Sequence, residues 1–216
     1  MAVRPGGNSE VRRLIAAALA EAERHGWQDF QMRHAARRAG LSAARARAHF
    51  AHKEDLADAW LAEADAAMLA AADALEDASP AERLAGTLLA WLDHLSPHRR
   101  VAAGIFAGRL YPFHPHDVVR QVRWTSRTVQ GWREAAGREA RSPRRQAEEI
   151  ALTWIFAATL VRWSLDASPG QARTRKFLGA ALRAAGRAAK TAGRLACAAS
   201  PRAIRPRTVR RRSAQS

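Results

Sequence analysis

Four Ser-Pro pairs punctuate residues 1–188 of the sequence, at residues 79–80, 96–97, 142–143 and 168–169. Serine is a favoured N-cap residue and proline is favoured in the first turn of a helix, so each pair predicts a helix start. The blocks between the pairs are rich in alanine and carry leucine at helical spacing. Because helix starts recur at short intervals, the sequence predicts an all-α protein built as a bundle of antiparallel helices.

Stripes of apolar residues at helical spacing indicate where the individual helices lie. Val11, Ile15, Ala18 and Ala22 form one stripe, and Gly26 is placed to end that helix. The predicted helices cover residues 10–25, 32–39, 43–50, 53–77, 80–95, 97–110, 116–140, 143–166 and 169–188.

The composition restricts the class of protein. The chain has 216 residues, 48% of them hydrophobic, and a single cysteine, Cys197. One cysteine excludes an internal disulfide and is typical of a reducing compartment. The N-terminus has no apolar signal-peptide core, and the most apolar run, residues 150–161, is too short to cross a bilayer. We therefore expect a cytoplasmic protein with no membrane partner.

Residues 32–50 contain the clearest functional motif. A helix is followed by a break at Gly40 and by a second short helix with Ser42 as its predicted N-cap. This is a helix-turn-helix arrangement, in which the second helix enters the major groove of double-stranded DNA. The sequence thus predicts a DNA-binding domain over residues 1–52.

Several segments resemble the N-terminal domain of TetR/AcrR repressors. They are "HGW", "AARRAGLS", the Phe50 that ends the second helix, and "KEDLADAWL", and the resemblance runs from Ser9 to Leu61. It implies a homodimeric, ligand-responsive transcriptional regulator, associated with the nucleoid and expected to repress at a palindromic operator. It also implies that residues 53–188 form a helical bundle that binds the effector and dimerises through helices 143–166 and 169–188.

The second helix of the motif departs from the family pattern. Ala44, Arg45, Ala46 and Arg47 stand where members usually carry a small residue, a threonine and a Leu-Tyr pair. Ala46 predicts weaker packing, whereas arginines can reach guanine edges or phosphates. The resemblance places a phosphate contact at Lys53, and the alternative is that the arginines only solvate a short helix. The predicted DNA-contacting residues are Arg33, Ser42, Ala43, Ala44, Arg45, Arg47, His49 and Lys53.

Large aromatic residues gather in the second half of the chain, where the resemblance implies an effector site. A pocket between bundle helices would take a small apolar or aromatic effector, although each residue could equally belong to an ordinary core. Helix 143–166 is apolar in nearly every direction, which predicts burial in the core or against a second subunit, with Leu152 among the outward positions. The predicted effector-binding residues are Trp91, Phe106, Tyr111, Phe113, Trp124 and Trp154.

A metal site and an enzymatic role are the weaker hypotheses. His114, His116 and Asp117 are candidate metal ligands, but a loop with two prolines is a poor place for ligands at helical spacing, and no cysteine partner exists. The sequence has no glycine-rich phosphate loop and no nucleophile paired with a base. We expect no metal, no cofactor and no catalysis.

One alternative function stays open. The segment "LVRWSLDASPGQARTRKFL", residues 160–178, resembles the C-terminal segment of the TetR-like lipid-binding proteins of ubiquinone biosynthesis. That resemblance implies a carrier of an isoprenoid lipid that no longer binds DNA. In those lipid-binding proteins the second helix of the helix-turn-helix motif lacks basic residues. This chain has Arg45 and Arg47 there, which favours the regulator.

The net charge of +16 is concentrated near the C-terminus, because no acidic residue follows Asp166. Residues 189–216 are predicted to form a disordered basic tail, since they have few large apolar residues. We expect this tail to raise the affinity for DNA of any sequence through counterion release.

Overall fold

The computed structural model describes residues 5–109, 115–137 and 144–199, and within them every regular element is helical. The all-α prediction is therefore confirmed. The elements are α1 (Pro5–His25), α2 (Met32–Arg38), α3 (Ala43–His49), α4 (Lys53–Asp73), α5 (Pro80–Leu95), the 3-10 helix η1 (Ser96–His98), α6 (Arg99–Arg109), α7 (Pro115–Ala135), α8 (Arg144–Leu165), the 3-10 helix η2 (Pro169–Gln171) and α9 (Ala172–Ala199).

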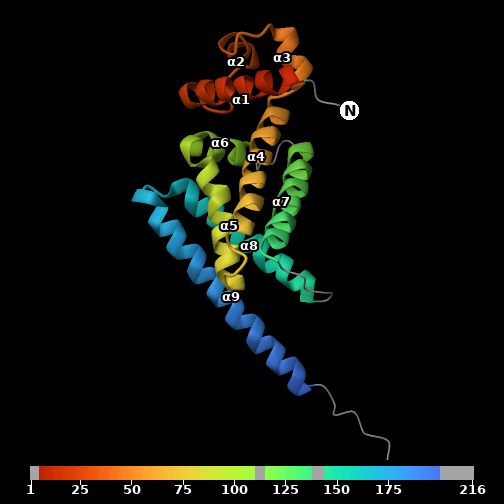
Figure 1. Cartoon of the computed structure of the whole chain (residues 1–216), viewed down its shortest axis with the longest axis vertical. Helices are drawn as coiled ribbons and strands as arrows, with labels where there is room; N and C mark the ends of the chain where they lie inside the picture. Colours follow the sequence, from red (N-terminus) through yellow and green to blue (C-terminus); the bar gives the residue numbers. More distant parts are fainter. Residues whose placement is uncertain (1–4, 110–114, 138–143, 200–216) are drawn as a thin grey trace, which may run out of the picture.

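The helices form a small N-terminal unit on top of an elongated bundle. Helices α1, α2 and α3 lie together at one end of the molecule, and α4 runs from them into the bundle (Figure 1). In the bundle, α4 packs on α5 and α7, while α9 packs on α5 and α8. The buried apolar residues form one continuous cluster from α1 to α9, so the two parts share a core.

The described Ser-Pro pairs begin helical segments as predicted. Ser79 is the N-cap of α5: its Oγ accepts from the Glu82 backbone N–H at 3.4 Å, and its own N–H donates to Glu82 Oε2 at 2.9 Å. This is the predicted capping box. The pairs at 96–97 and 168–169 open the short η1 and η2 helices that lead into α6 and α9. The pair at 142–143 lies outside the described residues.

The predicted end of the last helix at residue 188 is wrong, because α9 continues to Ala199. Residues 189–199 lack a large apolar face, but five of the eleven are alanine, and Lys190, Arg194 and Leu195 also have high helix propensity. A helix already nucleated by packing can extend through such residues without a new nucleation cost.

Among the described helices, none combines the length and the apolar character that are needed to cross a bilayer.

Candidate functional site

The turn between α2 and α3 positions the second helix of the motif. Gly40 has a φ of 69°, which a residue with a Cβ adopts only at a cost, so the predicted break depends on glycine here. Ser42 is the N-cap of α3, and its Oγ accepts from the Arg45 backbone N–H at 3.1 Å. Ala46 and Phe50 are buried. The helix-turn-helix geometry predicted from the sequence is therefore present.

Ala46 fits its place in the core, although it is small. Its side chain is completely buried, so α3 packs on its neighbours through an alanine where a larger residue was expected. A smaller side chain at this position buries less apolar area, and α3 accordingly depends more on its serine cap and on its polar contacts to α1.

The outward side of α3 is small and basic. Ser42, Ala43, Ala44, Arg45 and Arg47 are all exposed. The Arg47 side chain makes no hydrogen bond or ion pair within the part of the chain that the structure describes. Small side chains let a helix approach a surface closely, and an unpaired guanidinium can then reach base edges or phosphates.

Arg45, in contrast, is held by a carboxylate of α1. Arg45 Nε donates to Glu10 Oε2 at 2.9 Å, and His49 Nε2 lies 2.8 Å from the same oxygen. These hydrogen bonds, from His49 and then from Arg45, hold the pKa of Glu10 below its ordinary value. Glu10 thus fixes two predicted DNA-contacting side chains, although sequence reasoning did not select it.

Two further predicted DNA contacts have protein neighbours. Lys53 Nζ donates to the backbone carbonyls of Trp27 and Gln28 at 3.2 and 2.9 Å and lies 5.9 Å from the ring centroid of Trp27. Arg33 is exposed, and its Nε lies 3.4 Å from His34 Nε2. In this conformation Lys53 ties the start of α4 to the turn after α1, and Arg33 is the more accessible of the two cations.

An aromatic cluster fills the interior of the bundle. Trp91 and Phe106, two of the predicted effector-binding residues, lie with ring centroids 6.2 Å apart, and Trp124 is 5.5 Å from Phe106. Phe156 packs edge-on to Trp91 at 5.6 Å, which the sequence did not indicate. Tyr111 and Phe113 lie outside the described residues.

The cluster carries two ionisable groups. Trp91 Nε1 donates to Asp65 Oδ1 at 2.7 Å, and burial raises the pKa of Asp65. The guanidinium of Arg109, at the end of α6, lies 5.8 Å from the ring centroid of Trp124 and is paired with Asp58. Its buried Nη1 has no hydrogen-bond partner among the residues that the structure describes. The interior is thus apolar with a few polar groups, as in small-molecule sites.

Trp154 and Leu152 do not lie where the sequence predicted. Trp154 is 73% exposed on the outer side of α8, whereas Leu152 is buried. The grouping of Trp154 with the interior aromatic residues and the outward position of Leu152 are therefore both wrong. Because α8 is apolar on every side, its sequence alone does not fix which residues face the core.

The outer side of α8 and the start of α9 border an open groove of about 640 Å³. Small residues such as Ala157 and Ala158 line it together with the large side chain of Trp154. Large apolar side chains continue along α8 on the same side, where Ile150 is 61% exposed, Val161 60% and Leu165 79%. The groove is lined by Trp154, Ala157, Ala158, Val161, Arg162, Leu165, Asp166, Arg173 and Phe177.

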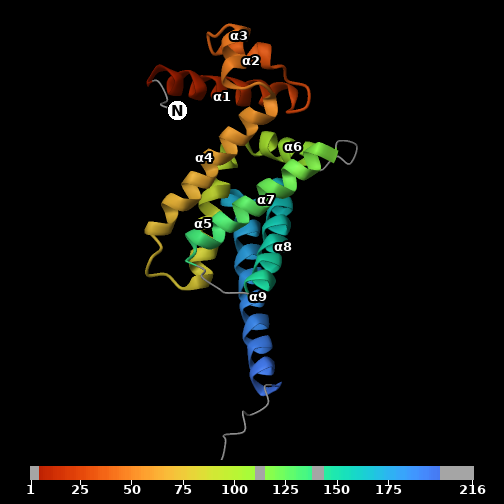
Figure 2. The same cartoon turned by 90° about the vertical axis from the view of Figure 1, so that its right-hand side faces the viewer.

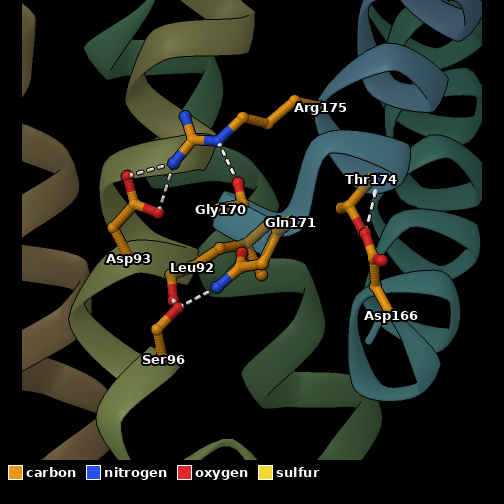
Figure 3. Close-up of polar contacts among 8 residues, drawn as sticks. All are labelled: Leu92, Asp93, Ser96, Asp166, Gly170, Gln171, Thr174 and Arg175. Carbon is orange, nitrogen blue, oxygen red and sulfur yellow. Dashed lines mark hydrogen bonds and ion pairs between the residues drawn. The ribbon is translucent and has the colours of Figure 1, made fainter. Parts of the chain in front are cut away.

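Polar contacts fix the junction between α8 and α9 (Figure 3). Asp166 is buried, and its carboxylate accepts from the backbone and hydroxyl of both Ser168 and Thr174, which holds its pKa well below the usual range. Arg175 donates to both oxygens of Asp93 at 2.7 and 2.9 Å, which ties α9 to α5 (Figure 3).

The structure does not describe the side chains of the candidate metal ligands that the sequence analysis set aside. His114 lies outside the described residues, as do the side chains of His116 and Asp117 at the start of α7. Among the described residues, no group of three histidine, cysteine, aspartate or glutamate side chains could hold a metal ion.

No protein-family model matches the chain, and no curated protein matches it in sequence. Among solved structures, the chain is similar to the TetR transcriptional regulator from Nitrosomonas europaea ATCC 19718. The TM-score is 0.73 and the sequence identity 31%, over 82% of this chain and 97% of that one. This similarity extends from the helix-turn-helix unit through the bundle, far beyond the segment that carries the family motifs. The chain therefore belongs to the TetR family of transcriptional regulators.

Proposed function

We propose that the protein is a homodimeric, ligand-responsive repressor that binds a palindromic DNA operator through α3. The observation that carries this proposal is the outward side of α3, where small residues surround Arg45 and Arg47 on a capped helix. A helix of this kind can lie in the major groove, with arginines bidentate to guanine. Ser42, Ala43 and Ala44 would approach the DNA at its N-terminal end, and Arg33, His49 and Lys53 would flank it.

The outer side of α8 supports the dimer. Trp154, Val161 and Leu165 are exposed next to an open apolar groove, an arrangement that is rare on a monomer surface. We propose that a second copy covers this face through its own α8 and α9, which gives a two-fold symmetric interface. Two α3 helices related by that symmetry would fit the two half-sites of a palindrome.

Helix α6 lies between the aromatic cluster and the N-terminal unit, so its contacts support a coupling between effector binding and the position of α3. On one side, Gly104 lets α6 approach the turn after α1: a Cβ there would lie 3.2 Å from the Cβ of Trp27. On the other side, Phe106 and Arg109 contact Trp124 of the aromatic cluster. An effector that binds among these aromatic residues and favours a different position of α6 would shift the spacing of the two reading helices and release the operator.

The cluster also indicates the class of effector. Its rings favour a flat apolar or aromatic molecule, and Nη1 of Arg109, which has no partner among the described residues, would donate to a polar or anionic group on that molecule. The positions of Tyr111 and Phe113 in this site remain predictions, as do the cytoplasmic, nucleoid-associated location and the lack of catalysis.

The segment that resembles lipid-binding proteins makes internal contacts in this structure. Ser168 and Thr174 both donate to the Asp166 carboxylate in the α8–α9 junction, and Leu178 is buried in the core. These contacts account for the sequence pattern without a lipid, so we do not propose the lipid-carrier function.

Selection of DNA from a random-sequence pool by the full-length protein tests the proposal. We expect enrichment of a palindromic site that the protein binds at least about 10³-fold more tightly than random DNA. A pool that shows no enriched sequence, although the protein is folded and dimeric, would reject operator binding by α3.

A further inference from the structure

Helix α9 continues past the part that packs on the bundle. Leu178 and Leu182 are buried, whereas the described side chains from Arg183 to Arg194 are exposed apart from the half-buried Ala185. In both views this part of α9 extends from the end of the molecule opposite to α3 (Figures 1 and 2). We call residues 183–194 the basic arm.

The cations of the basic arm lie on one side of the helix. Arg183, Arg187, Lys190 and Arg194 follow one another at intervals of four, three and four residues. At 3.6 residues per turn these positions fall within about 60° of one another. They are also turned away from the side on which the buried leucines pack. The arm therefore presents a continuous basic stripe to solvent.

Within the described part of the chain, no acidic side chain neutralises this stripe. The sequence has no acidic residue after Asp166, and none of the four cations forms an ion pair within the described residues. Arg175, nearer the start of α9, is by contrast paired with Asp93. Successive cations of the arm rise only about 4.5–6 Å along the axis, so they repel one another unless an anionic partner lies beside them.

The other residues of the arm indicate which anionic partner fits. Between residues 183 and 194 they are alanine, glycine and threonine only. A helix that lies in a membrane interface needs large apolar side chains on one face, and a protein interface needs aromatic or large apolar anchors. The backbone of double-stranded DNA needs neither, because cations that replace its condensed counterions suffice for binding.

We propose that the basic arm binds the phosphate backbone of a second DNA duplex, so that the operator-bound protein bridges two DNA segments. The second duplex follows from position, since α3 and the arm lie at opposite ends of the molecule (Figure 2). A short operator cannot fold back to the arm, because DNA has a persistence length of about 150 bp. Bridging rests on the proposed operator binding by α3, whereas DNA binding by the arm does not.

The size of the effect follows from counterion release. Each neutralised phosphate contributes about 0.9 to the slope of log affinity against log salt, so one arm with four cations would contribute up to about 3.6. Binding of the second duplex should therefore weaken steeply with salt and depend little on its sequence.

The test uses full-length protein with residues 200–216 retained in every variant. The arm variant carries Arg187→Gln, Lys190→Gln and Arg194→Gln. The matched control carries Arg100→Gln, Arg127→Gln and Lys176→Gln, which removes the same charge from exposed positions in α6, α7 and the part of α9 that packs on the bundle. Beads that carry a duplex selected by the wild-type protein retain the dimer, and a labelled random duplex of about 30 bp is then offered in solution.

We expect wild-type and control proteins to capture the labelled duplex and the arm variant to capture at least about tenfold less, at equal retention on the beads. Equal capture by the arm variant would overturn the proposal. So would a wild-type protein that captures no second duplex but binds vesicles of phosphatidylserine and phosphatidylcholine through the arm. Retention of the protein on the beads measures operator binding by α3 separately. If the protein is not retained, DNA binding by the arm can still be measured by titrating the labelled duplex with the Arg45→Ala, Arg47→Ala protein, with and without the arm changes.

Discussion

Helices α3 and α8 each present an exposed side that the protomer leaves uncovered, but the two sides have opposite chemistry. The side of α3 consists of small residues with Arg45 and Arg47, whereas that of α8 consists of large apolar residues such as Trp154 and Leu165. Burying one large apolar side chain is worth about 1.5–3 kcal/mol, while a small basic surface gains little from burial and more from neutralising an anion. This difference is why we propose DNA as the partner of the first surface and another copy of the protein as the partner of the second.

The largest expected effect is on the apolar surface. Trp154→Glu or Val161→Glu places a charge in the proposed dimer interface, where it would be buried without a partner, so we expect monomer or aggregate in place of the dimer. Leu69→Glu is the matched control, since Leu69 is a half-exposed leucine on α4, away from the groove. Light scattering distinguishes the species. A stable dimer for both α8 variants would mean that α8 does not form the interface.

The next effect concerns the basic surface. Replacing both Arg45 and Arg47 by alanine should weaken operator binding by about 5- to 150-fold for each bidentate arginine–guanine pair removed, with the fold and the dimer intact. Arg100→Ala with Arg127→Ala removes the same charge from the bundle and should change operator affinity only slightly. The measurement is the affinity of both variants for the selected operator. Equal decreases in the two variants would show a general charge effect in place of base recognition.

A smaller effect is expected at Glu10. Glu10→Gln removes the carboxylate that holds Arg45 and His49, so affinity for random DNA should rise several-fold while the preference for the operator falls. The pKa of Glu10 is lowered, so its contacts are present above pH 4.5, its ordinary value, and disappear only as the pH falls further. Between pH 6 and 8 the protonation of Glu10 should not affect DNA binding. A rise in operator preference in the variant would show that Glu10 competes with DNA and does not position Arg45.

The smallest expected effect distinguishes the contribution of a helix cap to protein stability from its contribution to DNA recognition. Ser42→Ala and Ser79→Ala each remove an N-cap, at a cost of about 1 kcal/mol. Only Ser42 caps α3, so only Ser42→Ala should also lower operator affinity. Denaturant unfolding and DNA titration of both variants provide the comparison, and a matching decrease of DNA affinity in Ser79→Ala would remove the special role of the α3 cap.

Local signals explain why the sequence predicted the helices and the motif so closely. The break at Gly40, the cap at Ser42 and the capping box at Ser79 each depend on residues within one turn of one another. Such contacts form in any context that permits the helix, so they can be read from the sequence without the fold.

The features that the sequence did not predict depend on how distant segments meet. Glu10 reaches Arg45 and His49 only because α1 crosses α3, and no local pattern marks that pairing. Along α8, large apolar residues stand on both sides, so periodicity could not assign Trp154 to the surface and Leu152 to the core.

Footprinting of the selected operator by the full-length protein tests the central claim most directly. We predict two protected major-groove segments related by two-fold symmetry, separated by roughly 34–36 Å or a multiple of it, and absent for the protein with Arg45→Ala and Arg47→Ala. Protection that is continuous along the duplex, or that persists unchanged in the double variant, would contradict recognition of DNA by two α3 helices in a dimer.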